Sequence, residues 1–149
     1  VLENDDKASM WSVQMLYDYF HKQVGIPITF DYFHHKFHTS DLSEEQALRL
    51  ASTTWPDGIR QCTHYSESRR DEYCLLVEDT ARKQGIRDWQ NWDLFADEYA
   101  KFQKIKATAH ADFIFDEIAD YGLELDIMLE AKAKEQALIH YRDSVLSVY

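Results

Sequence analysis

The chain has 149 residues, the length of at most one ordinary domain. Its composition is 45% hydrophobic and 14% aromatic, which is enough for a packed core and excludes a wholly disordered chain. The formal net charge of −11 argues against a nucleic-acid partner, because phosphate-binding proteins usually carry a basic surface. That objection weakens if bound cations neutralise several of the carboxylates.

No stretch approaches the roughly 20 apolar residues of a membrane span, and no signal-peptide layout is present, so we expect no membrane partner and no secretion. Two cysteines, Cys62 and Cys74, fit a reducing compartment. We therefore expect an intracellular protein, in the cytoplasm of a prokaryote or the nucleus of a eukaryote. The chain begins at Val1 as if in mid-strand, and we expect it to be part of a longer protein.

Strands and helices alternate over the first 64 residues. We predict strands over residues 1–6, 27–31 and 59–64, and helices over residues 9–23 and 43–53. Gly25 ends the first helix, and the capping-box sequence from Ser43 to Gln46 opens the second. This βα rhythm is typical of an α/β fold with a parallel sheet.

Residues 70–106 break the rhythm and form a predicted helical insertion of two helices, over about 69–84 and 88–106. The aromatic residues of the insertion are expected to pack within it, rather than to stack on bases. A short helix ending near Tyr121, a strand over 123–130 and a last helix over 132–147 complete the chain.

Residue types that bind metals recur at the ends of the predicted strands. Asp31 ends the second strand and His34 follows it, and a carboxylate with an imidazole is a ligand pair for a borderline divalent ion. A solvated loop pair is the alternative for these two, as a frayed acidic terminus is for Glu3. The complete set of candidate ligands is Glu3, Asp31, His34, His64, His110 and Glu130. Such a mixture suits two or three divalent ions about 3.5–4 Å apart, which activate water for attack on a phosphodiester.

Five motifs in order resemble the UV damage endonucleases: LENDD, FDYFHH, HYSESR, AHADFI and DIMLEAKAKE. The resemblance implies a TIM-barrel fold, of which residues 1–149 would be the C-terminal half, about strands five to eight with their helices. It also implies incision of duplex DNA 5′ to UV photoproducts, and a divalent-metal cluster of manganese, or alternatively magnesium, zinc or cobalt. UV-damaged double-stranded DNA would be the partner, with the other half of the barrel or a second copy as further partners.

By the same resemblance, all six candidate ligands fall on family metal positions, and Glu3, His64 and Glu130 would be catalytic. Lys132 would meet a phosphate or be an ordinary helix-start lysine, and Arg69 and Arg70 would bind DNA or lie in a solvated turn.

Cys62 stands where the family usually has a lysine, either as a soft ligand or as a space-filling thiol. The alternatives to the endonuclease are a sugar isomerase or epimerase barrel, which also uses Glu, Asp and His at strand tips, and an inactive truncated product.

Overall fold

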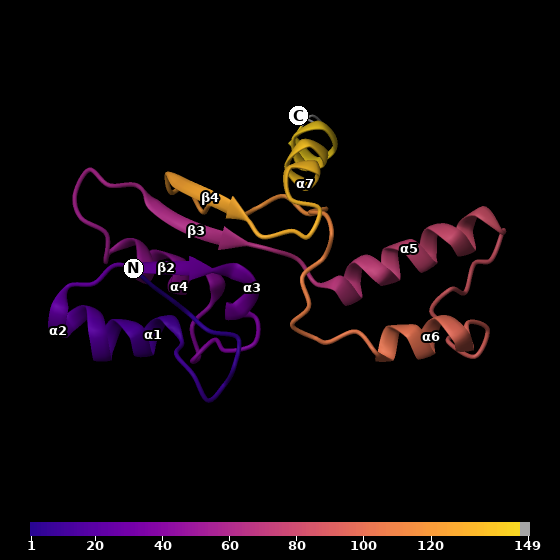
Figure 1. Ribbon diagram of the computed structural model, residues 1–149, viewed down its shortest axis with the longest axis horizontal. Coiled ribbons are helices and arrows are strands. Elements are labelled where there is room, and N and C mark those ends of the chain that lie inside the picture. Colours follow the sequence, from indigo (N-terminus) through magenta and orange to yellow (C-terminus); the bar gives the residue numbers. More distant parts are fainter. Residues whose placement is uncertain (147–149) are drawn as a thin grey trace. The chain divides into compact units, whose positions relative to one another are not determined.

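The computed structural model describes residues 1–146, which form two compact units. Unit 1 comprises Val1–Ser66 and Asp116–Glu130, and unit 2 comprises Glu67–Phe115 and the chain from Ala131 onward. No helix within the described residues combines the length and the apolar composition needed to cross a bilayer. Figure 1 shows the elements of both units.

Unit 1 is built on a parallel sheet. Its strands are β1 (Leu2–Glu3), β2 (Ile28–Asp31), β3 (Gln61–Tyr65) and β4 (Leu125–Leu129), and they lie in the order β1-β2-β3-β4 with every neighbouring pair parallel. The predicted α/β class with a parallel sheet is confirmed. Over residues 1–146 the sheet is open, with four strands, rather than closed into a barrel.

The helices of unit 1 begin where side chains cap their first backbone amides. These elements are α1 (Val13–Leu16), the π-helical turn η1 (Tyr17–His21), α2 (Lys22–Val24), α3 (Tyr32–His35) and α4 (Glu44–Ser52). The first helix starts at Val13 rather than at residue 9, because Ser12 Oγ accepts a hydrogen bond from the Met15 amide at 3.2 Å. The predicted capping box at Ser43 is present, with both reciprocal hydrogen bonds to Gln46 formed.

The two faces of the sheet differ in chemistry. Ile28 and Phe30 are fully buried on the face of β2 that meets α1 and α4. Because strand residues alternate, Thr29 and Asp31 point to the opposite face, and the register places Asp31 beside His64. One face of β2 thus contributes Ile28 and Phe30 to the apolar core, and the other face carries Asp31 beside His64.

Unit 2 holds α5 (Arg69–Lys83), α6 (Ala96–Gln103), α7 (Glu135–His140) and the π-helical turn η2 (Tyr141–Val145). The first predicted helix of the insertion is confirmed as α5, whereas α6 is shorter than predicted, because residues 88–95 form turns. The last helix starts at Glu135 rather than 132, since Lys134 has a φ of +52°, outside the helical region. Its predicted end at residue 147 lies outside the described residues.

The short helix predicted before Tyr121 does not form, and residues 111–120 are bends and irregular backbone. Carboxylates on α5 and just before it bind backbone amides at the start of this segment. Glu72 accepts hydrogen bonds from the Asp112 and Phe113 amides at 3.0–3.1 Å, and Glu67 accepts from the Phe115 amide at 3.0 Å. Buried side-chain acceptors thus satisfy these amides and fix the start of the segment.

Candidate metal centre

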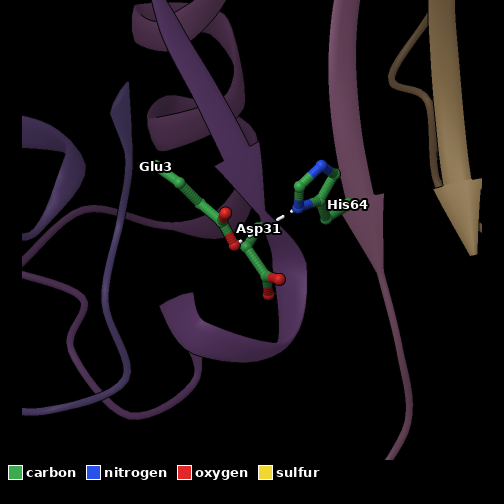
Figure 2. Close-up of side chains that lie close together, drawn as sticks. All are labelled: Glu3, Asp31 and His64. Atoms are coloured by element: carbon green, nitrogen blue, oxygen red, sulfur yellow. Dashed lines mark ion pairs between the residues drawn. The ribbon is translucent and has the colours of Figure 1, made fainter. Parts of the chain in front are cut away.

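Three strands of unit 1 bring potential metal ligands together at their carboxyl ends. Glu3 ends β1, Asp31 ends β2 and His64 lies in β3, as Figure 2 shows. One ligand atom from each of the three residues lies within 4.8 Å of the others. The parallel register produces this meeting, because it aligns equivalent strand ends along one edge of the sheet.

The imidazole of His64 lies between two carboxylates. Its Nδ1 is 3.3 Å from Glu3 Oε1 and 3.3 Å from Glu130 Oε1. The position of Glu130 follows from the sheet, because its amide donates to the Tyr65 carbonyl at 2.8 Å and so continues the pairing of β3 with β4. The structure thus brings a residue from the end of β4 to the residues of β1 and β3.

His34 approaches the same carboxylates from α3. Asp31 caps this helix, with its Oδ1 accepting from the His34 amide at 2.7 Å. The His34 Nδ1 lies 2.8 Å from the Asn4 carbonyl oxygen, 3.4 Å from Glu3 Oε1 and 3.7 Å from Asp31 Oδ2. Since a carbonyl oxygen only accepts, Nδ1 carries the proton, and Nε2 carries the lone pair when the ring is neutral.

Asn4 is a residue of this site that the sequence analysis did not single out. It is almost completely buried, and its side-chain amide accepts from the Asp31 amide at 2.8 Å and donates to the Asp31 carbonyl at 3.0 Å. It thus fixes the backbone of Asp31 while its own carbonyl orients His34. The only signal in the sequence was its place inside the LENDD motif.

Burial and neighbouring charges shift the pKa values of Asp31 and His34. Burial raises the pKa of Asp31 to about 6; the negative charges of Glu3 and Glu130 act in the same direction, against the His34 amide and the His34 charge. Burial lowers the pKa of His34, but the Asp31 charge, the Asn4 carbonyl and the Glu3 charge together raise it above its ordinary value. The ionised form of Asp31 is therefore disfavoured, and the charged form of His34 is favoured.

These donors fit a divalent cation. Asp31 Oδ2 and His64 Nδ1 are buried and make no hydrogen bond, the state expected of atoms that await another partner. Two donors that each lie about 2.1 Å from a shared ion are about 3.0–3.4 Å apart at octahedral or tetrahedral angles. The separations of 3.3 Å from His64 Nδ1 to Glu3 and Glu130 match that spacing.

Cys62 lies on the same face as His64, in register with Asp126 on β4. Burial, followed by the charges of Asp126 and Glu3, raises the pKa of its thiol. The raised pKa favours the neutral thiol in the metal-free chain, and whether Cys62 ligates a soft metal or fills space stays a prediction.

The remaining predicted site residues belong to unit 2. His110 pairs with Ser68 in an isolated antiparallel bridge, and the adjoining Arg69 amide donates to the Ala109 carbonyl at 2.8 Å. The Arg69 guanidinium is held by Glu72 and, at 2.6 Å, by Asp112. Arg70 donates to the Ile105 carbonyl at 2.8 Å, and Lys132 is exposed. The role of Arg69, Arg70 and Lys132 in binding DNA and that of His110 as a metal ligand stay predictions.

Comparison with known proteins agrees with the resemblance seen in the motifs. The family model of UV-endonuclease UvdE matches residues 1–148. A UV-damage endonuclease of Schizosaccharomyces pombe is 33% identical over 144 residues, which are 93% of this chain and 19% of that protein. The crystal structure of SacUVDE has a TM-score of 0.63 and 26% identity, covering 99% of this chain and 39% of that chain. The chain thus spans less than half of either relative, and it belongs to the UV-endonuclease UvdE family.

Proposed function

We propose that this chain carries a divalent-metal centre of a UV-damage endonuclease, and that the centre incises duplex DNA 5′ to UV photoproducts. One observation carries the proposal: donors of Glu3, Asp31 and His64 converge within 4.8 Å, and two of the converging residues have a buried atom without a hydrogen bond. Family membership supports the endonuclease over the sugar isomerase, the other activity considered for such donors.

Glu3, Asp31, His34, His64 and Glu130 would hold the ions, with His110 of unit 2 as a further ligand. When bound, divalent ions lower the pKa of water and stabilise the leaving oxygen of a phosphodiester. Asn4 keeps the His34 ring in one tautomer and the Asp31 carboxylate in place. Manganese is our first candidate, because a mixture of carboxylates and imidazoles suits it, with magnesium, zinc and cobalt as alternatives.

The fold around the centre would be the C-terminal half of a TIM barrel, with residues 70–106 as an insertion. The open edges of β1 and β4 need a partner in this proposal, either the other half of the barrel or a second copy of the chain. Both cysteines are free thiols, which supports an intracellular site.

Nicking of supercoiled plasmid tests the proposal. We expect the chain with Mn²⁺ to nick UV-irradiated plasmid, leaving a 3′-hydroxyl, and to leave unirradiated plasmid intact. Chelator should abolish the reaction, and Glu130→Gln should reduce it at least a hundredfold. Mutation of residues that only hydrogen-bond to a metal ligand already lowers activity by about 10–100-fold.

Glu124→Gln is the matched control, because Glu124 precedes the same strand but its side chain is 89% exposed and pairs only with Arg60. This variant should nick like the wild type. Full activity of Glu130→Gln would refute the metal centre, and nicking that ignores irradiation would refute the specificity.

A further inference from the structure

Unit 2 contains a group of basic side chains without a carboxylate partner. Within residues 1–146, half of the 16 Lys and Arg residues form ion pairs with a carboxylate: Lys22, Arg49, Arg60, Arg69, Arg82, Lys83, Lys101 and Arg142. Among the other half, six belong to unit 2, and five of these, all except Arg87, are carried by three short segments. We call these five the basic strip: Arg70, Lys104, Lys106, Lys132 and Lys134.

Hydrogen bonds join the segments that carry the strip. Arg70 Nε donates to the Ile105 carbonyl at 2.8 Å, and its guanidinium carbon lies 5.3 Å from the centre of the Phe102 ring. The Arg69 amide donates to the Ala109 carbonyl at 2.8 Å, and the Lys132 amide donates to the Ala111 carbonyl at 3.0 Å. The start of α5, the end of α6, the segment around His110 and the loop before α7 are therefore linked to one another by hydrogen bonds.

The carboxylates close to this surface are already engaged. Glu67 and Glu72 are buried and bind the backbone amides of residues 112–115. Arg69 forms ion pairs with both Glu72 and Asp112, which removes Arg69 itself from the free cations. Asp71 and Glu135 are exposed carboxylates next to the strip in sequence, and Asp116 and Glu117 are exposed just beyond the segment around His110. The strip thus holds five cations without a carboxylate partner among the described residues, on a chain whose net charge is −11.

We propose that the basic strip binds the sugar–phosphate backbone of a nucleic-acid duplex. The proposal rests on the proposed function and deepens it, since it gives the segment from α5 to α6 the role of holding the DNA. A chain of this net charge repels DNA at long range, so binding requires cations gathered in one place. Cations that already hold a carboxylate would have to break that ion pair, whereas those of the strip exchange only water and counterions for a phosphate.

The salt dependence of the binding constant reports the number of phosphate contacts. Each contact contributes about −0.9 to the slope of log K against log salt concentration. The test variant is Lys104→Gln/Lys132→Gln/Lys134→Gln. The control is Arg82→Gln/Lys83→Gln/Lys101→Gln, which removes the same charge from the same unit but only cations paired with Asp79 or Glu98. Lys101 and Lys104 are the most closely matched pair of positions, because both lie in α6 or at its end. Lys101 forms an ion pair with Glu98, whereas Lys104 has no carboxylate partner among the described residues.

Binding is measured by fluorescence anisotropy with an undamaged duplex of about 20 base pairs, in chelator, between about 50 and 200 mM salt. We expect the strip variant to lose about 2.7 from the magnitude of the slope and the control to keep it. Equal losses in both variants, an unchanged slope in the strip variant, or no duplex binding by the wild type would overturn the proposal. Tighter binding to a Glu-rich peptide than to the duplex would also overturn it.

Because binding is measured without metal, its outcome is separate from incision. If the wild type binds through the strip but never nicks irradiated plasmid, the proposed function is refuted and the strip proposal stands. If the strip variant and the control nick with the same salt dependence, the strip proposal is refuted and the proposed function stands.

Discussion

Replacing the buried carboxylate of Asp31 tests two properties of the candidate metal centre: how much this carboxylate destabilises the metal-free chain, and whether it binds the metal. Asp31 has no exposed surface, and burial is the main reason that its pKa rises to about 6 from an ordinary value of 3.8. One pKa unit corresponds to about 1.4 kcal/mol, so a difference of about two units is worth about 3 kcal/mol. This free energy opposes folding of the metal-free chain whenever Asp31 is ionised.

The Asp31 carboxylate binds its proton more tightly in the folded state than in the unfolded state. Asp31 therefore does not lower the free energy of unfolding below about pH 4. The destabilisation grows as the pH rises to about 6 and then stays constant. Asp31→Asn removes the charge but keeps an oxygen that can accept from the His34 amide and cap α3. Without metal, we expect the variant to exceed the wild type in stability by up to about 3 kcal/mol at pH 7.5, and to equal it near pH 4.

Urea unfolding followed by circular dichroism, in chelator and across this pH range, measures the difference. In a second series, Mn²⁺ should stabilise the wild type and not the variant, because a neutral amide is a weaker ligand than a carboxylate. The prediction that Asp31 destabilises the metal-free chain is refuted if Asp31→Asn is less stable than the wild type at pH 7.5 in chelator. The prediction that Asp31 binds the metal is refuted if Mn²⁺ stabilises both proteins equally.

Two further substitutions test the elements that support the site. Asn4→Ala leaves the buried amide and carbonyl of Asp31 without their side-chain partner, so we expect urea unfolding to show a loss of about 2–3 kcal/mol and calorimetry a weaker affinity for Mn²⁺. Unchanged Mn²⁺ affinity would limit Asn4 to a structural role. Ser43→Ala removes the capping box of α4, a helix that contributes none of the candidate ligands, and it should cost about 1 kcal/mol in thermal or urea unfolding while Mn²⁺ affinity stays the same.

The sequence predicted well those features that depend on residues close together in the chain. The alternation of β3 placed His64 on the polar face, and the capping sequence at Ser43 placed the start of α4. Ser12 carried an equally local signal, and the N-cap preference for serine would have moved the first helix to its observed start.

Long-range hydrogen bonds account for what the sequence did not reveal. Where a helix was expected before Tyr121, Glu72, about 40 positions earlier, accepts from the amides of Asp112 and Phe113 and so fixes the start of an irregular segment. Asn4 likewise looked like one more polar residue in an acidic end, until the fold placed it against Asp31, 27 positions later. Local propensity carries no information about such partners.

The stability of unit 1 and the affinity of its proposed metal centre depend on the same arrangement of charges. The fold brings the carboxylates of Glu3, Asp31 and Glu130 to one sheet edge, and burial, together with the charges of Glu3 and Glu130, raises the pKa of Asp31 although His34 acts in the opposite direction. A divalent ion bound there would remove the repulsion between the carboxylates and replace the hydration that Asp31 lost on burial. Selection for the metal centre would therefore keep an arrangement that lowers the stability of the metal-free chain. If removal of a carboxylate stabilises the chain in chelator and also abolishes the stabilisation by Mn²⁺, two independent results identify that carboxylate as a ligand. If the carboxylate has a purely structural role, its removal destabilises the chain both in chelator and with Mn²⁺.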